Sequence, residues 1–508
     1  MLLTLGPWSR RGFLRAGAAS AATFTCLGWD RALKTASAAE AAAPAALDTP
    51  PLGDLKPVLQ EIVREMEKRV PYASVLVVRQ GLKHLQVDDR SREIQDLFPS
   101  AGAVFTVWNG AWFEESATSE LDPDRLRATG RELAAAVTRQ KDRHTIDPGP
   151  AAERSFDTAC VIDPRKLPLA DRLERVAELH RRARKGLGPE FANCEASVSE
   201  GMQKSLFVNR TRALEQSVVR TRANVNLFAG DGQRTVNDYL SRGGTGGLEV
   251  VAYTDEELDT LAAETRALLK ATAVPAGEHQ AIGDGSVSGT IAHESFGHGV
   301  ELDMFVKERA LAAQFVGKRV GSEYVNIVDD PSLAGGYGSY FFDDEGVLSG
   351  PTKIVVNGVF ERGLSDLMSA TALGVARSAN GRRQDISRKC YARMSNTFFQ
   401  SGSTPVEELI AGVKQGYLLT KLSHGMEDPK GWGIMVVAHV GQEIRDGKLT
   451  GRYASPVGVT GYVPDVLGTV DGISSEFVHD PGICGKGFKE FVPVSTGGPH
   501  IRFRARLG

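Results

Sequence analysis

The chain has 508 residues, of which 42% are hydrophobic, 24% are charged and only 7% are aromatic. This is the composition of an ordinary globular protein, and the length is sufficient for two or three domains with well-formed cores. The formal net charge of −3 gives no electrostatic basis for binding nucleic acid. The sequence has no run of 18 or more apolar residues, so it predicts no membrane-spanning helix.

The N-terminal segment is predicted to be an export signal rather than part of the fold. Arg10 and Arg11 precede a Phe-Leu pair and a weakly apolar, alanine-rich stretch, an order typical of a twin-arginine signal. Small residues near Ala38 offer a cleavage site, so residues 1–38 are interpreted as a signal peptide; a basic disordered tail is the alternative. Its removal deletes five basic residues and one acidic residue and changes the net charge from −3 to −7. The expected location is the periplasm or the extracellular space, with no membrane span after cleavage.

The cysteines are too few for a disulfide scaffold, since the chain has only five and Cys26 falls in the predicted signal. One disulfide between two of Cys160, Cys194 and Cys390 is compatible with an oxidising compartment. Spacing alone does not choose the pair.

The first half of the mature chain predicts a mixture of helices and strands. Residues 39–53 are rich in Ala and Pro and are interpreted as a disordered linker. Apolar residues at helical spacing predict helices over residues 54–70, 122–140, 171–187 and 255–274. Strand pairs with Gly or Asn-Gly turns are predicted over residues 72–87 and 103–116, and a meander of strands over residues 195–229.

The second half, from residue 275 onward, consists mainly of short β-rich segments separated by glycines. Helices are expected at a motif segment, residues 289–305, and near residues 364–376 and 405–416. The predicted fold class is therefore α+β. A mixed α/β N-terminal and central region, residues 54–274, is followed by a β-rich, barrel-like C-terminal domain, residues 275–508, which carries the motif helix.

The motif segment contains His293, Glu294 and His298. A zinc peptidase helix usually reads H-E-x-x-H, with its histidines four residues apart, whereas these are five apart. In a regular α-helix a five-residue step rotates roughly 140° beyond a full turn, so the imidazoles would diverge. We therefore expect a π-bulge, for which Gly297 gives the backbone latitude. Neutral imidazoles suit zinc, and Glu294 is suited to act as general base on a metal-bound water. The alternative is a chance cluster.

A catalytic zinc needs a third protein ligand and leaves one position for water. The candidates are Cys484, which stands between glycines, the other histidines, and carboxylates such as Glu301 or the pair Asp343 and Asp344. For Asp343 and Asp344 a structural role in a turn is favoured over a second metal site. His424 and His439 are interpreted as ordinary surface or core histidines.

Five segments of the second half follow one another in the order HESFGHGVELD, FFDDEGV, ANGRRQD, YARMSNTFF and GICGKGFKEFVPVSTGGPHIRF. In this order and spacing the chain resembles the TldD/PmbA metallopeptidase family, strongly from about residue 275 to the end. In that family the H-E-x-x-x-H helix and a distant cysteine bind zinc. The resemblance implies one Zn²⁺ per chain, held by His293, His298 and Cys484, with Glu294 as general base. It also implies hydrolysis of peptides or unfolded polypeptides inside the cavity of a dimer.

TldD-type subunits keep the metal motif and PmbA (TldE)-type partners lack it, so this chain is similar to the TldD type. The implied assembly is a homodimer or a heterodimer with a PmbA-like subunit. Two features depart from the family. Its members are typically cytoplasmic and have no export signal. This chain also reads CGKGFKEF where the family has a glutamine in CGKxGQ. The second difference alters the expected wall of the substrate site near Cys484.

Three further residues are candidates for supporting roles. Arg393 and Asn396 are predicted to line the substrate cleft and hold peptide carbonyls or a terminus, and a buried polar pair that supports the sheet is the alternative. Glu301 is expected to support the metal-binding helix without binding the metal itself. Two other functions stay open: a non-catalytic subunit that uses zinc structurally, and a hydrolase of a non-peptide amide.

Overall fold

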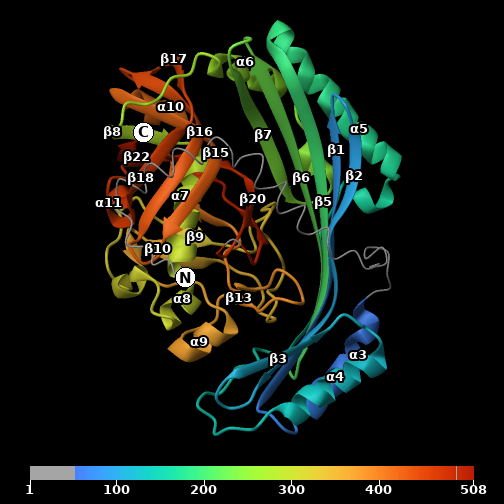
Figure 1. The fold of residues 1–508 in the computed structure, drawn as a ribbon. Helices are drawn as coiled ribbons and strands as arrows, with labels where there is room; N and C mark the ends of the chain where they lie inside the picture. Colours follow the sequence, from blue (N-terminus) through green and yellow to red (C-terminus); the bar gives the residue numbers. More distant parts are fainter. Residues whose placement is uncertain (1–51, 488) are drawn as a thin grey trace, which may run out of the picture. The chain divides into compact units, whose positions relative to one another are not determined.

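The computed structural model describes residues 52–487 and 489–508 (Figure 1). The predicted signal peptide, residues 1–38, and all but the last two residues of the predicted linker, residues 39–53, lie outside the described residues. Among the described helices, none combines the length and the apolar character needed to cross a membrane.

The described residues form two sheet-based regions. The α-helices are α3 (Lys56–Met66), α4 (Pro123–Ala136), α5 (Leu169–Ala183), α6 (Asp255–Leu268), α7 (Gly285–Phe296), α8 (Leu302–Val306), α9 (Leu367–Leu373), α10 (Val406–Ala411) and α11 (Val463–Gly468). The strands of the first sheet are β1 (Tyr72–Asp88), β2 (Arg92–Trp108), β3 (Phe113–Thr118), β4 (Ala152–Asp157), β5 (Phe191–Asn209), β6 (Arg212–Gly230) and β7 (Thr235–Thr245). The predicted α+β class is confirmed.

The first sheet is built from long antiparallel strands in the order β3-β2-β1-β5-β6-β4, with β7 also paired to β6. Only β4 runs parallel to its neighbour. The predicted turn at Gly81 is wrong, because β1 continues through it for 17 residues with a register shift between Gln80 and Leu82. Strands on both sides of β1 supply partners, so the glycine is accommodated within the strand as an irregularity. The predicted Asn-Gly turn is confirmed, since Trp108 of β2 pairs with Phe113 of β3.

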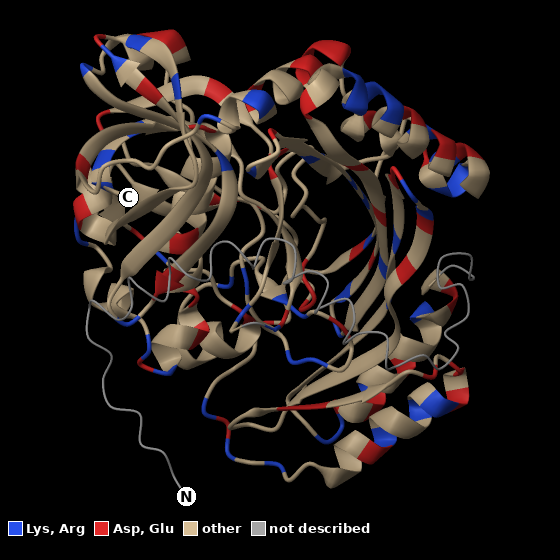
Figure 2. Cartoon of the chain, turned by 45° about the horizontal axis from the view of Figure 1, so that its top comes forward, with Lys and Arg blue, Asp and Glu red and all other residues tan. Residues whose placement is uncertain are grey.

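The four longest helices of this region cover one face of the first sheet. α5 and α6 pack over Cys194 and Ala196 of β5, and α3 and α4 pack over Leu206 and Val208 of the same strand. Because side chains alternate along a strand, Phe207 faces the other way, and there it packs against Phe342 of the second half. The C-terminal region therefore lies against the face that the helices leave open (Figure 1). Lys, Arg, Asp and Glu are mixed along these four helices (Figure 2).

The C-terminal sheet has the order β15-β8-β22-β18-β16-β17, with β19 paired to β22 and a further pairing between β15 and β16. Its strands are β8 (Gly277–Gly283), β15 (Gln415–Asp428), β16 (Gly433–Arg445), β17 (Lys448–Ala454), β18 (Val457–Tyr462), β19 (Gly472–Val478) and β22 (Gly498–Leu507). The pairings of five strands close a circuit, but β18 and β22 share only the pairs Val459 with Leu507 and Thr460 with Arg506. The closure is thus partial, and the expected barrel-like domain is not a regular barrel.

Short strands complete the second half, in a four-stranded sheet β11-β10-β9-β14 and the pairs β12-β13 and β20-β21. They are β9 (Ile327–Asp329), β10 (Thr352–Val356), β11 (Val359–Phe360), β12 (Gly381–Arg382), β13 (Tyr391–Ala392), β14 (Thr397–Phe399), β20 (Pro481–Cys484) and β21 (Val492–Ser495). The helices predicted near residues 364–376 and 405–416 are confirmed as α9 and α10.

Helix α7 runs through the core of the C-terminal region, and every residue of it except Ser286 is buried. Ile291 and Phe296 belong to the same core as Phe503 of β22 and Trp432, which lies in the turn between β15 and β16. A Cβ at Gly289 would overlap the carbonyl oxygen of Thr496, so only glycine allows the helix to approach this closely. A helix that is enclosed on all sides in this way is held rigidly, which fixes the side chains at its C-terminal end.

Candidate metal centre and active site

The two motif histidines lie on either side of a helix end. His293 is in the last turn of α7, which ends at Phe296, and His298 opens a short 3-10 turn, His298–Val300. The predicted π-bulge is therefore wrong. Gly297, with φ −98° and ψ −85°, leads the chain out of the helix while its amide still donates to the carbonyl oxygen of His293 at 2.8 Å. The second imidazole is redirected by a helix end instead of an inserted residue.

Gly297 is required here by a close approach of neighbouring atoms. A Cβ at this position would overlap the carbonyl oxygen of His293 and would lie 2.8 Å from Cγ of Met394. Carbon atoms in ordinary contact are separated by about 3.5–4 Å, so no side chain fits without moving the turn that carries His298.

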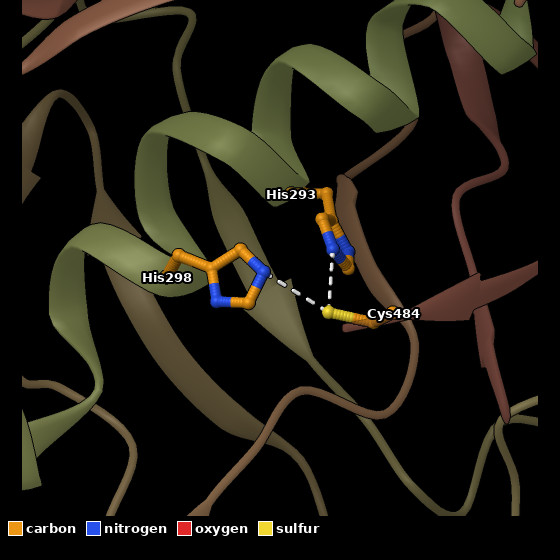
Figure 3. A group of neighbouring side chains, drawn as sticks. All are labelled: His293, His298 and Cys484. Atoms are coloured by element: carbon orange, nitrogen blue, oxygen red, sulfur yellow. Dashed lines mark hydrogen bonds between the residues drawn. The ribbon is translucent and has the colours of Figure 1, made fainter. Parts of the chain in front are cut away.

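The two imidazoles and the Cys484 thiol meet at one point (Figure 3). Cys484 lies at the end of β20, yet its Sγ is 3.3 Å from Nε2 of His293 and 3.0 Å from Nε2 of His298. The three ligand atoms all lie within 4.8 Å of one another, and this is the one such group of metal-binding side chains among the residues the structure describes. His293 and Cys484 are each 4% exposed.

This donor set fits a zinc ion. Two imidazole nitrogens and one thiolate are ligands that zinc accepts, and three protein ligands leave a position open for water or substrate. Asp343 and Asp344 do not join the group. The carboxylate of Asp343 accepts backbone N–H groups of Glu345, Val347 and Gly381, as the structural interpretation predicted.

The protonation of the three side chains is coupled. Burial alone would raise the pKa of the Cys484 thiol, but the charges of His298, Arg393 and His293 outweigh it and hold that pKa well below its usual value. Burial would lower the pKa of His298, and here Cys484 and Glu301 outweigh it and raise that pKa well above its usual value. The Cys484 thiolate and the His298 imidazolium thus stabilise one another. A bound metal cation would replace the proton of the imidazolium as the positive charge beside the thiolate.

Glu301 lies behind His298, as expected from the sequence. Its Oε2 is 3.3 Å from Nδ1 of His298 and accepts a hydrogen bond from Nζ of Lys486 at 2.7 Å. Burial would raise the pKa of Glu301, but Lys486, His298 and Arg393 lower it below its usual range. The ionised carboxylate holds the Nδ1–H of His298, which leaves Nε2 free to face Cys484.

Arg393 and Asn396 do not face an open cleft. Arg393 is 1% exposed, and its guanidinium donates to Sγ and to the carbonyl oxygen of Cys484 and lies 3.3 Å from Oε1 of Glu301. Asn396 is 0% exposed, and its amide bonds to Asp330, Ser339 and Gly338. The alternative of buried polar groups describes both residues better than the prediction that they line the cleft, because both Nη atoms of Arg393 and the side-chain amide of Asn396 are hydrogen-bonded within the chain.

The predicted base, Glu294, is packed against the edge of β15. It is 9% exposed, and burial raises the pKa of its carboxyl group. A Cβ at Gly425 of β15 would lie 2.7 Å from Oε1 of Glu294 and 2.7 Å from Cγ2 of Thr290. The absence of a side chain at Gly425 therefore makes room for the Glu294 carboxylate.

Sequence reasoning missed Lys486, Gly425 and Glu427. Lys486 follows Cys484 by two residues, and its ammonium bonds both Glu301 and Asp303 at 2.7 Å. Its position in the segment GICGK was a signal that could have identified it. Gly425 and Glu427 are distant from the motif in the chain, and no local pattern marks them.

The other predicted residues have no place in this group. His424 and His439 are partly buried on β15 and β16, and Nε2 of His439 lies 2.8 Å from the carbonyl oxygen of Asn237. Among the described cysteines, Cys160, Cys194 and Cys390 are free, so the structure contains no disulfide between them.

Comparison with known proteins relates the second half of the chain to one family and the whole chain to metalloproteases. Residues 276–506 match the family model described as PmbA/TldA metallopeptidase C-terminal domain. A protein of Methanothermobacter thermautotrophicus named metalloprotease is 30% identical over 459 residues, which are 88% of this chain and 97% of that protein. A protein of Saccharolobus solfataricus named zinc metalloprotease TldD homolog is 30% identical over 237 residues, which are 46% of this chain and 52% of that protein.

Two solved structures share the fold. TldE from Thermococcus kodakarensis has a TM-score of 0.67 at 16% sequence identity and covers 89% of this chain and 99% of its own. A putative modulator of DNA gyrase from Bacteroides thetaiotaomicron has a TM-score of 0.70 at 16% identity and covers 90% of this chain and 99% of its own. At this level of identity the likeness concerns the fold alone.

Proposed function

The chain belongs to the PmbA/TldD metallopeptidase family, and on that premise we propose that it is a zinc-dependent peptidase of the TldD type. In this proposal His293, His298 and Cys484 hold one zinc ion, and Glu294 is the general base. The observation that carries the proposal is the convergence of two imidazole nitrogens and one sulfur within 4.8 Å, beside a glutamate that is directly bonded in sequence to the first histidine.

The proposed chemistry is hydrolysis of an amide bond. When bound, zinc would polarise the scissile carbonyl and lower the pKa of a water molecule. The Glu294 carboxylate takes the proton of that water and passes it to the nitrogen of the leaving amine. Its raised pKa suits this task, because a carboxylate whose pKa lies closer to the working pH is a stronger base toward the water and can still release the proton to the amine. Glu301 holds the imidazole of His298 in one tautomer throughout, and Lys486 keeps Glu301 ionised.

The substrates in this proposal are peptides or unfolded polypeptides. The chain acts as a homodimer or together with a PmbA-like subunit, for which the shared fold with TldE gives support. Export through the twin-arginine route to the periplasm or the extracellular space stays a prediction from the sequence.

Metal content and hydrolysis of unfolded casein, measured together on the wild type and on Glu294→Ala, test the function. We expect about one zinc per chain in both proteins, because Glu294 is outside the ligand group. Hydrolysis by the variant should fall by about 10²–10⁴, the usual contribution of a general base. Glu408→Ala, at an exposed carboxylate on α10, is the matched control and should keep full activity.

Two outcomes would contradict the proposal. Zinc in both proteins without cleavage of any peptide would identify a subunit that needs a partner or a hydrolase of a different amide. Absence of zinc from the wild type would remove the metal assignment itself.

Gly425→Ala tests the packing of the base. The new methyl group would displace the Glu294 carboxylate or Thr290, and a displacement of about 1 Å at a catalytic group costs on the order of a hundredfold in rate. We expect kcat to fall by about this factor while zinc content and the far-UV circular dichroism stay unchanged. Gly468→Ala is the control, because a Cβ there meets no atom within 4 Å. Unchanged kcat in Gly425→Ala would show that Glu294 tolerates movement and is not positioned by β15.

A further inference from the structure

A second carboxylate, Glu427, lies beside the metal centre, and one of its oxygens has no hydrogen-bond partner among the described residues. Its Oε2 is buried and, within the described part of the chain, accepts no hydrogen bond. Glu427 is two residues beyond Gly425 on β15, with no register shift between them, so both residues face the same side of the strand. Gly425 faces Glu294, and Oε2 of Glu427 lies 3.4 Å from the position of a Cβ at Gly299, the residue after His298.

Glu427 is not part of the metal-binding group itself. The ligand atoms that lie within 4.8 Å of one another are those of His293, His298 and Cys484, and no carboxylate oxygen joins them. The carboxylate of Glu427 therefore lies next to the centre. It is on the same face of β15 as Gly425, the residue that packs against Glu294.

Glu427 is partly exposed, but its buried Oε2 has no hydrogen bond within the described residues, and such an oxygen costs free energy that a neighbouring cation would offset. Burial raises the pKa of Glu427 well above its usual value; His298 opposes this shift, and Glu294 adds to it. Arg393 and Lys486 are both engaged elsewhere, Arg393 with Cys484 and Lys486 with Glu301. A cationic group of a substrate that enters beside the proposed metal would therefore find Oε2 of Glu427 free to accept a hydrogen bond.

We propose that Glu427 binds the α-ammonium group of the substrate, so that the enzyme removes residues from the amino terminus of a peptide. This inference rests on the proposed function. In a peptide, one carbon atom separates the α-amino nitrogen from the first carbonyl carbon. A carboxylate that recognises this ammonium must therefore lie close to the residues that act on the carbonyl. Glu427 meets this requirement, because its oxygen lies against the turn that carries His298.

The first experiment compares hydrolysis of a short peptide that has a free amino terminus with that of its N-acetylated form. A third peptide is N-acetylated and carries lysine as its first residue, which supplies an ammonium on a side chain instead. We expect kcat/KM of the wild type to be about tenfold or more higher for the free peptide than for the acetylated one. A hydrogen bond to a charged group stabilises a complex by enough free energy to give a factor of about ten. In Glu427→Gln the ratio of kcat/KM for the free peptide to that for the acetylated peptide should fall to about one. Only the activity on the free peptide should decrease. Glu408→Gln should behave as the wild type.

The second experiment measures equilibrium binding of the same labelled peptides by fluorescence anisotropy, with Glu294→Ala and Glu294→Ala/Glu427→Gln loaded with zinc. Binding of the free peptide should weaken about tenfold in the double variant, and binding of the acetylated peptide should not change. Thermal unfolding of Glu427→Gln should occur at or above the temperature of the wild type, because glutamine keeps the side-chain volume and carries no carboxylate that burial would penalise.

These measurements separate the two proposals. If no peptide is cleaved but the free peptide binds about tenfold more tightly in a Glu427-dependent way, the recognition of the ammonium group stands and the hydrolytic function is wrong. Equal cleavage and equal binding of free and acetylated peptides would overturn the role of Glu427 and leave the peptidase intact. A preference for the acetylated lysine peptide would overturn the α-ammonium assignment.

Discussion

The Cys484→Ala protein is expected to fold, to lose its zinc and to lose peptide hydrolysis in one step. Among the described residues Cys484 is the one thiol grouped with His293 and His298, and it is the one ligand that comes from outside the motif segment. The two histidines, one at the end of α7 and one in the 3-10 turn after it, leave the ion with half of its coordination sphere unfilled by protein. Because removal of a residue that merely supports a ligand already costs 10–100-fold in metal affinity, removal of the ligand should cost more.

Zinc content and thermal unfolding with and without a chelator check this result. Zinc at a hundredfold excess over its Kd stabilises a protein by about 2.7 kcal/mol, so chelation should lower the Tm of the wild type and leave that of Cys484→Ala unchanged. Cys160→Ala is the matched control, since Cys160 is a free cysteine outside the centre. Retention of a full equivalent of zinc by Cys484→Ala would mean that another residue is the third ligand.

The Arg393→Met protein should lose about 3–5 kcal/mol of unfolding free energy, the usual cost of breaking a buried ion pair from one side. The guanidinium is enclosed and bonds Cys484 and the carbonyl oxygen of Glu490, and it lies 3.3 Å from Glu301. Methionine fills a similar volume but leaves these acceptors without a donor. We also expect weaker zinc binding, because the thiolate of Cys484 loses a neighbouring positive charge.

Urea unfolding of the zinc-loaded proteins measures the loss of stability, and competition with a chelator of known affinity measures zinc binding. Arg388→Met is the control, because Arg388 lies 3.8 Å from Glu490 and its side chain is 44% exposed. A long pair with a largely exposed arginine contributes about 0–1 kcal/mol, although its partner Glu490 is only 8% exposed. If the two variants lose the same small amount of free energy, the guanidinium of Arg393 does not support the centre.

The motif histidines illustrate how far local sequence reaches. Adjacent His293 and Glu294 and the nearby His298 indicated a metal centre, although their spacing violated the period of a helix. The expected remedy was a π-bulge, and the structure uses a helix end at Gly297 instead. Sequence identified that the backbone must deviate at this glycine. The form of the deviation depends on Met394, whose side chain packs against Gly297 and comes from a distant part of the chain.

Polar residues near a recognisable motif were harder to interpret. Arg393 and Asn396 lie within a segment that matched the family, yet whether a polar side chain faces a cleft or the interior depends on elements that pack over it. Cys484 and Glu490 accept hydrogen bonds from Arg393, and the segment from Asp330 to Ser339 covers Asn396. A single sequence does not show which loops will meet.

By itself the sequence determined the α+β class, most of the helices and the motif that carries His293, Glu294 and His298, because these follow from hydrophobic periodicity and from the chemistry of histidine and glutamate. Spacing alone left the third ligand open, and only the resemblance to the family implied Cys484. The tertiary structure decided the rest. It runs β1 unbroken through Gly81, places Lys486 and Arg393 around Glu301, and leaves Oε2 of Glu427 without a hydrogen-bond partner among the described residues. These features arise where strands and loops far apart in the chain enclose the same small volume, and there burial and charge depend on every neighbour at once.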